Sequence, residues 1–191
     1  MPVLDITQAA DVGMRSFYNH FDSKEALFKA AVDEVLDRHG ALLESLTKSF
    51  RDPAEIFACS FRLTGRFFRA RPQESRVLLR SGTGPLMSER GLGPRALRDI
   101  TAANRAGRFH VADPELAVAM VFGTMLGLGQ LLHDHPDRDD ADTTDQMTET
   151  LLCAFGLPAA DAREISRRPL PNLDNSALRD PVASTRGRGW C

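Results

Sequence analysis

Apolar side chains recur along this chain at intervals of three and four residues, the spacing that gathers them on one face of an α-helix. The longest stripe runs through residues 24–50 and is interrupted by Gly40. Asp22, with Glu25 three residues on, has the spacing of a capping box and predicts the start of this helix. A sustained alternation of apolar and polar residues, which would indicate strands, is absent from the sequence. The pattern therefore predicts an all-α fold.

An aspartate followed by a proline marks the start of two further helices. Asp52-Pro53 and Asp113-Pro114 each place an N-cap side chain in front of a proline, which fits the first turn of a helix. The second of these helices runs to about His133 and is the most apolar stretch of the chain. Its apolar part is shorter than the roughly 20 residues of a membrane span, and charges flank it closely. We expect a buried helix and no membrane span.

Glycine and proline divide the rest of the pattern. Shorter helices are predicted over 73–80, 94–106 and 143–155, with Thr143 as the cap of the last. The Gly- and Pro-containing stretch 81–85 is expected to be a break, and Gly156 with Pro158 is expected to end the last helix. Beyond residue 168 the large apolar residues become sparse among Pro, Gly, Arg and Asn, which predicts a disordered tail over 169–191.

The most informative stretch is 6–28, ITQAADVGMRSFYNHFDSKEALF. It has the pattern of a short helix, a turn at residues 11–13, a second short helix and a capped third. Val12 and Phe17 are placed to anchor the turn and the second helix, and Phe21 to close a small core. This is the scheme of a helix-turn-helix, whose second helix enters the major groove of DNA.

The tract from Phe17 to Phe28, FYNHFDSKEALF, resembles the DNA-binding domain of the tetracycline-repressor (TetR) family of transcriptional regulators. The resemblance implies a helix-turn-helix with its connecting helix over 1–45 and a helical effector-binding and dimerisation domain over 46–168. The family has one more helix before the position of Ile6, where this chain has only residues 1–5. We therefore expect an incomplete helix-turn-helix that lacks its first helix.

The resemblance also assigns roles to single residues. Contacts to operator phosphates fall on Tyr18, His20 and Lys24. The positions that face the DNA and set the sequence preference are Met14, Arg15, Ser16 and Asn19. An arginine on a recognition helix can also read guanine through two hydrogen bonds.

The resemblance further implies a cavity among the central helices for a small, apolar effector. The apolar candidates for its lining are Phe57, Phe61, Phe67, Phe68, Leu97, Ile100, Met120, Phe122 and Met125, and the polar candidates at its edge are Arg62, Arg66 and Asn104. Each apolar candidate is equally consistent with plain core packing. Effector binding would move the helix at 24–50 and change the separation of two recognition helices in a homodimer.

Composition adds limits to this interpretation. The 191 residues carry a net charge of −2, which excludes a histone-like binder of polyanions but allows a local DNA-reading face. The three cysteines are scattered, so neither a disulfide framework nor a zinc knuckle is indicated, and we expect a reduced, cytoplasmic protein. The His- and Asp-rich stretch 133–140 is interpreted as a solvated loop rather than a metal site. No metal and no cofactor is expected.

The expected function is a ligand-responsive homodimeric repressor, released from a palindromic operator by a small effector. The dimer is expected to form through the helices 113–133 and 143–155, because a helix as apolar as the first must be covered on nearly every side. Two alternatives stay open. One is a helical dimerisation or scaffold protein that has lost DNA binding through N-terminal truncation. The other is a helical enzyme, although no nucleophile, base and orienting acid occur at a suggestive spacing.

Overall fold

The computed structural model describes residues 2–89 and 91–171, and within these ranges the secondary structure is helical throughout, without strands. The all-α prediction is confirmed. In chain order the described helices are α1 (Val3–Ala9), α2 (Met14–His20), α3 (Lys24–Thr47), α4 (Pro53–Ala70), α5 (Pro72–Ser81), α6 (Thr83–Met87), α7 (Gly93–Arg105), α8 (Pro114–Asp134), α9 (Asp140–Ala154) and α10 (Ala159–Arg167).

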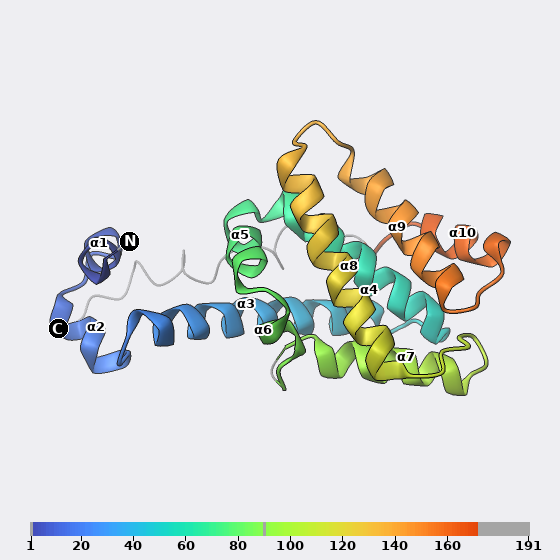
Figure 1. The fold of residues 1–191 in the computed structure, drawn as a ribbon, viewed down its shortest axis with the longest axis horizontal. Helices are drawn as coiled ribbons and strands as arrows, with labels where there is room; N and C mark the ends of the chain where they lie inside the picture. Colours follow the sequence, from blue (N-terminus) through green and yellow to red (C-terminus); the bar gives the residue numbers. More distant parts are fainter. Residues whose placement is uncertain (1, 90, 172–191) are drawn as a thin grey trace.

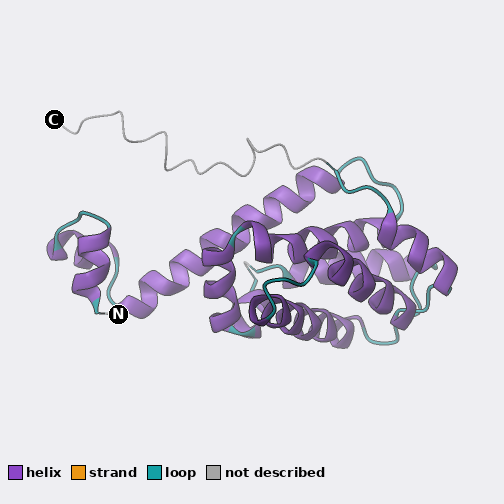
Figure 2. Ribbon diagram, turned by 90° about the horizontal axis from the view of Figure 1, so that it is seen from above, coloured by secondary structure: helices purple, strands orange, loops and turns teal. Residues whose placement is uncertain are grey.

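Helix α3 is a long rod that joins two unequal parts of the molecule (Figure 1). The short helices α1 and α2 lie at its N-terminal end, and the remaining helices gather around its C-terminal half (Figure 2). Helix α4 is the centre of this larger part, because it packs against α3, α5, α7, α8, α9 and α10. Helix α3 therefore connects the helices around α4 to the small N-terminal lobe, which consists of α1 and α2.

The two Asp-Pro helix starts form as the sequence predicts. The carboxylate of Asp52 accepts a hydrogen bond from the amide of Ala54 at 3.0 Å, and that of Asp113 accepts one from Glu115 at 2.9 Å. These bonds satisfy amides that have no partner within their own helix. Local chemistry alone fixes both starts.

Two other predicted caps are wrong. Helix α3 is capped by Ser23, whose hydroxyl accepts from the amide three residues on at 3.1 Å, so Asp22 lies one residue before the cap. Helix α9 begins at residue 140 because Asp139 accepts from the amide of Asp142 at 2.9 Å. Thr143, predicted as the cap, lies inside that helix and donates to the carbonyl of Asp139 at 2.5 Å.

Two helices lie where the sequence predicts none. Helix α6 begins inside the stretch 81–85, directly after Gly82, which has a positive φ of 69°. Helix α10 follows Gly156 and Pro158, and it buries Ala162, Ile165 and Ser166 while packing on α9 and α4. Both are short, so their apolar residues are too few to show a helical period in the sequence. Most of the expected tail, from residue 172 onward, lies outside the described residues.

The core of the larger part is rich in phenylalanine. Phe57, Phe109 and Phe155 contact one another with ring centroids 5.2 to 5.6 Å apart. Gly65 allows α9 to approach α4 closely, because a Cβ at this position would overlap the side chain of Thr144. The central helix α4 is thus held on one side by rigid packing.

Helix α8 is the one helix in the described part of the chain that is long and apolar enough to cross a membrane, with a mean hydropathy of 1.6. It packs against α4, α5, α6, α7 and α9, which makes it a core helix of the larger part. Its outer face is nevertheless exposed: Leu116 is 69% and Met120 41% accessible, and Gly123 and Gly127 lie on the same face.

Candidate cavity and DNA-binding helix

Helix α2 turns one aromatic side chain inward and leaves its other residues at the surface. Phe17 is 6% exposed and contacts the ring of Tyr18 at 5.1 Å and that of Phe21 at 5.8 Å. All seven residues expected to contact DNA are exposed: Met14, Arg15, Ser16, Tyr18, Asn19, His20 and Lys24. Lys24 is also the first residue of α3, where free amides and the helix dipole favour an anion such as phosphate.

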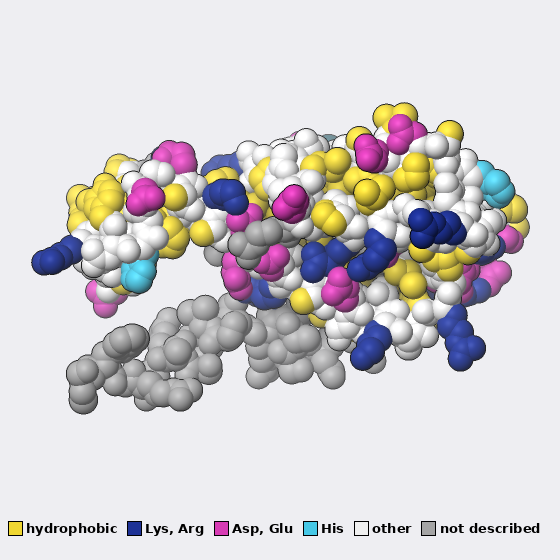
Figure 3. All heavy atoms as spheres, turned by 90° about the horizontal axis from the view of Figure 1, so that it is seen from below, with side chains coloured by type: hydrophobic (Ala, Val, Ile, Leu, Met, Phe, Trp, Pro, Cys, Tyr) yellow, Lys and Arg dark blue, Asp and Glu magenta, His cyan; other side chains and the backbone are white. Residues whose placement is uncertain are grey.

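The turn between α1 and α2 is held by the backbone and by a buried threonine. Asp11 adopts a left-handed φ of 53°, and the amide of Val12 donates to the carbonyl of Thr7 at 3.0 Å. Thr7 is 2% exposed and was not predicted, whereas Val12, predicted as an anchor, is 46% exposed. Hydrophobic side chains gather on the surface of this lobe (Figure 3). Leu4 in α1 is 51% exposed, and Phe28 near the start of α3 is 41% exposed.

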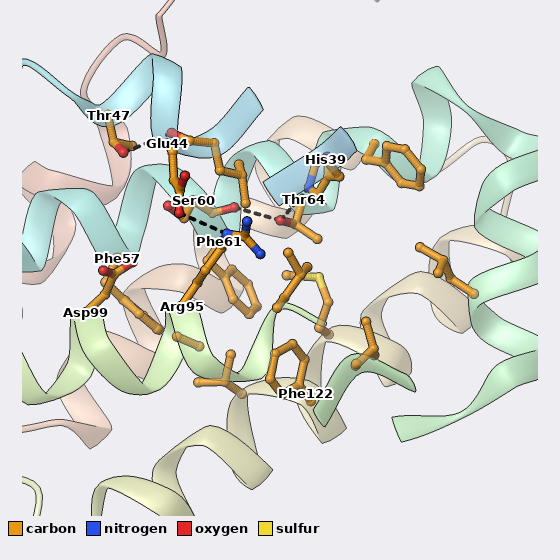
Figure 4. Close-up of a pocket in the computed structure, with 18 of the residues that line it drawn as sticks. His39, Glu44, Thr47, Phe57, Ser60, Phe61, Thr64, Arg95, Asp99 and Phe122 are labelled. Carbon is orange, nitrogen blue, oxygen red and sulfur yellow. Dashed lines mark hydrogen bonds and ion pairs between the residues drawn. The ribbon is translucent and has the colours of Figure 1, made fainter. Parts of the chain in front are cut away.

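A cavity of about 80 Å³ lies in the larger part, between α3, α4, α7 and α8 and next to α5 and α6. Roughly 10–15 Å³ of such volume holds one water-sized group, so this space holds several such groups. Its walls are mainly apolar and include five phenylalanines, Phe57, Phe61, Phe67, Phe68 and Phe122. Polar side chains meet these walls at two separate places (Figure 4).

The first polar end of the cavity joins α7 to α3. Nε of Arg95 donates to Oε1 of Glu44 at 3.0 Å, and Nη1 of Arg98 reaches the same oxygen at 3.4 Å. The hydrogen bond from Arg95 holds the pKa of Glu44 below its ordinary value. Asp99, paired with Arg98 at 3.1 Å, also lines the cavity, and burial raises its pKa. This end offers both a cation and acceptors to a ligand hydroxyl.

The second polar end joins α3 to α4. Nε2 of His39 lies 2.9 Å from Oγ1 of Thr64, and this hydroxyl donates to the carbonyl of Ser60 at 2.8 Å (Figure 4). The imidazole also packs on the ring of Phe67, with centroids 4.9 Å apart. Burial lowers the pKa of His39 from 6.5 to about 4, so the ring is neutral at pH 7.

Two parts of the chain match known protein families. Residues 52–168 match the sequence model described as "Tetracyclin repressor-like, C-terminal domain", and residues 1–31 match that of "Bacterial regulatory proteins, tetR family". The chain belongs to the TetR family. It is therefore a transcriptional regulator with a DNA-binding helix-turn-helix, and this class is not enzymatic, which sets aside the enzyme alternative.

Two solved structures of one protein, RolR, are similar to this chain. RolR without ligand is 32% identical, with a TM-score of 0.74, over 90% of this chain and 89% of that one. RolR in complex with resorcinol is 31% identical, with a TM-score of 0.69, over 90% of this chain and 85% of that one. A comparison with curated protein sequences found no match.

The structure brings together only part of the cavity set predicted for this TetR-family chain. Six of the apolar candidates line the cavity: Phe57, Phe61, Phe67, Phe68, Phe122 and Met125. Three apolar candidates do not. Ile100 is fully buried in the core, Leu97 packs against that core, and Met120 points outward from α8 with 41% of its side chain exposed.

The polar candidates all lie elsewhere, because each has a structural partner. Arg62 makes two hydrogen bonds with Asp145, at 2.8 and 3.1 Å, and Arg66 donates to the same carboxylate at 2.8 Å. The side-chain amide of Asn104 makes a reciprocal pair with the backbone of Val111, at 2.6 and 2.9 Å. None of the three lines the cavity.

The polar residues that do line the cavity were missed from the sequence, among them His39, Glu44, Thr64, Arg95 and Asp99. One signal for them existed. Gly40 interrupts an otherwise regular helix, which indicates that another group approaches the backbone closely. That group is the guanidinium of Arg95.

Proposed function

We propose that this protein is a homodimeric repressor that leaves a palindromic operator when a small phenolic compound enters the cavity between α3, α4, α7 and α8. The observation that carries the proposal is the link between Arg95 and Glu44, which ties the cavity wall on α7 to the helix that leads to the DNA-binding lobe.

The chemistry of the cavity supports a phenol. Its aromatic walls suit the faces of a benzene ring, since aromatic rings pack favourably edge to face. Arg95 can donate a hydrogen bond to a phenolic oxygen, and the carboxylates of Asp99 and Glu44 can accept one from the phenolic O–H. The solved relative RolR binds resorcinol, a benzene ring with two hydroxyls, in one of its structures.

The path from cavity to DNA is helix α3. Its 24 residues span about 36 Å, with the recognition helix α2 at one end and Glu44 near the other. A ligand hydroxyl that bonds to Arg95 or Glu44 competes with their mutual hydrogen bond and so changes the side-chain link between α3 and α7. A ligand that binds one position of α3 more tightly than another shifts the protein toward that position. The affinity of the protein for operator then changes with it.

The dimer is proposed to form through α8 and α9, as expected from the sequence. The outer face of α8 carries two exposed apolar side chains, Leu116 and Met120. Gly123 and Gly127 on the same face have no side chain, which lets a partner helix approach closely. A twofold pair of such helices places two copies of α2 on successive half-sites. Because a bacterial transcriptional regulator must reach DNA inside the cell, we place the protein in the cytoplasm.

The test is operator release. The purified protein is titrated against labelled DNA from upstream of its own gene, with and without resorcinol, and fluorescence anisotropy reports the bound fraction. Arg95→Met should still bind DNA but lose the response to resorcinol. Arg105→Met, an exposed arginine on the same helix, is the matched control. Absence of any DNA binding would favour the scaffold alternative, and DNA binding that no phenol changes would contradict the effector assignment.

A further inference from the structure

The hydroxyl of Thr64 determines which nitrogen of His39 carries the proton. That hydroxyl has a single hydrogen, and its oxygen lies 2.8 Å from the carbonyl of Ser60 and 2.9 Å from Nε2 of His39. A carbonyl can only accept, so the Thr64 hydrogen points to Ser60 if that bond is made. Both contacts are hydrogen bonds only when Nε2 is protonated and donates to Thr64.

The other ring nitrogen, Nδ1, is then an acceptor that receives no hydrogen bond from the described residues. The neutral imidazole has one donor and one acceptor nitrogen, and Nδ1 has no partner among residues 2–89 and 91–171. In that same part of the chain, Thr144 Oγ1 is the one side-chain polar atom that is both fully buried and unpartnered. Nδ1 of His39 has no partner and yet is not such an atom, so part of its surface must be accessible. Because His39 lines the cavity, that accessible surface faces the cavity (Figure 4).

We propose that His39 is a specificity-determining residue, which presents an unprotonated Nδ1 to the cavity and selects effectors with a hydrogen-bond donor at the end away from Arg95. This rests on the proposed function, in which the cavity takes a phenol. His39 and Glu44 are five residues apart on α3, or about 7.5 Å of helix rise. The matching ligand is a phenol whose second O–H or N–H group lies across the ring from its hydroxyl.

The surroundings of His39 make the difference in affinity between ligands with and without this donor large. His39 is 6% exposed and its ring contacts that of Phe67 at an angle of 51°, so water does not readily replace a missing ligand donor. A site that hydrogen-bonds a ligand group rejects the analogue that lacks it, because its own polar atom is left unpaired. Thr64 acts through His39 and is a positioning residue.

Three compounds of equal size test the proposal by isothermal titration calorimetry. They are 4-(hydroxymethyl)phenol, which offers a donor across the ring, 4-methoxyphenol, which offers only an acceptor there, and 4-ethylphenol, which offers neither. The wild-type protein should bind the first about tenfold more tightly than the other two, equivalent to about 1.4 kcal/mol. Equal affinities for all three would overturn this inference alone. Failure of all three to bind would overturn the proposed function and this inference with it.

Two variants separate the roles of the pair. In Thr64→Val the ring is free to protonate Nδ1, so 4-methoxyphenol should bind as tightly as 4-(hydroxymethyl)phenol, with 4-ethylphenol weaker. In His39→Phe all three should bind alike. Thr150→Val, which removes the same kind of hydroxyl-to-carbonyl bond on an exposed face of α9, should keep the wild-type ranking. A wild-type ranking in Thr64→Val would contradict the positioning role.

The ring nitrogens also report directly. In ligand-free protein at pH 7, ¹H–¹⁵N correlation spectra of the histidine side chains should show His39 protonated at Nε2, and Thr64→Val should shift this signal toward the other tautomer. A wild-type spectrum with the proton on Nδ1 would overturn the proposal, whatever the compounds do.

Discussion

The guanidinium of Arg95 lies against the backbone of Gly40, so closely that a Cβ on Gly40 would be 2.7 Å from Cζ of Arg95. A glycine inside a helix costs about 1 kcal/mol relative to alanine. Here the missing side chain leaves room for Arg95 to reach across α3 and donate to Glu44 at 3.0 Å. Gly40 thus lowers the intrinsic stability of α3 and at the same time makes room for the arginine of the proposed effector site.

Gly40→Ala should separate stability from ligand response. The alanine favours the helix, and the guanidinium, as the end of a flexible side chain, can move aside; we expect the free energy of unfolding to change by less than about 1 kcal/mol. Affinity for resorcinol should nevertheless fall, because Arg95 is displaced from Glu44. Urea unfolding and calorimetry measure the two effects. Gly84→Ala in α6, where a Cβ meets nothing within 4 Å, is the control. Unchanged affinity in Gly40→Ala would show that Arg95 does not hold the ligand.

The fold was predictable where it depends on local chemistry. The Asp52 and Asp113 caps and the long stripe of α3 are visible in the sequence, because a helix start and a helix face involve neighbours along the chain. Helices α6 and α10 were not predictable, because they span only 5 and 9 residues. Their stability comes from packing on other helices rather than from a periodic pattern.

The cavity was predictable only on its apolar side. The phenylalanines of α4 were identified because aromatic residues crowd one helix face. Arg95 and Glu44 are 51 positions apart, and in sequence each resembles a solvated surface charge. Arg62 was assigned to the cavity, but its partner Asp145 is 83 positions away on α9. Which charge faces a cavity and which faces a partner is decided by tertiary contacts.

Asp145→Ala should be strongly destabilising. The Arg62 side chain is 7% exposed and would lose both bonds of its bidentate pair, leaving a buried cation without an anion. Breaking one side of such a pair costs roughly 3–5 kcal/mol. Asp142→Ala, on the same helix, removes an ion pair with Arg167 that is about half exposed and should cost at most about 1 kcal/mol. Similar unfolding free energies for the two variants would contradict the buried role of Asp145.

His39 should make stability depend on pH between about 6.5 and 4. Its pKa falls from 6.5 in the unfolded chain to about 4 in the folded protein, through burial. Below pH 6.5 the unfolded chain binds a proton that the folded state excludes, so this stabilisation is present above pH 6.5 and is lost as pH falls toward 4. The loss attributable to His39 approaches about 3 kcal/mol. His39→Phe should be less sensitive to pH over this window in urea titrations, and an identical pH dependence would disprove the assignment.

Gly123→Leu should weaken the proposed dimer without harming the protomer. A Cβ on Gly123 meets nothing within 4 Å inside the protomer, so a leucine fits there, but it projects from the exposed face of α8. In the dimer it would overpack the contact with the partner helix. Light scattering should report a larger monomer fraction at low concentration. Ala102→Leu, on an exposed face of α7, is the control. An unchanged dimer in Gly123→Leu would place the interface elsewhere.

Lys24→Ala and Arg15→Ala should weaken operator binding in different ways. Lys24 begins α3 beside the free amides of its first turn, where it is placed to contact phosphate. Its loss should reduce affinity for all DNA sequences similarly and lower the slope of log K against log salt by about one. Arg15 is exposed in the first turn of α2, the part of a recognition helix that meets base edges. Its loss should relax the preference at one or two base pairs in each half-site, at about 1–3 kcal/mol if two hydrogen bonds to guanine are lost.

Anisotropy titrations over a range of salt, on the operator and on single-base variants of it, distinguish these effects. Lys48→Ala, an exposed lysine beyond the other end of α3, should leave both the salt slope and the sequence preference unchanged. If Lys24→Ala instead altered the sequence preference and kept the salt slope, Lys24 would contact bases and not phosphate. The surface of α2 would then meet the groove at a different angle, because the first turn of α3 would have to lie inside the groove rather than on the backbone.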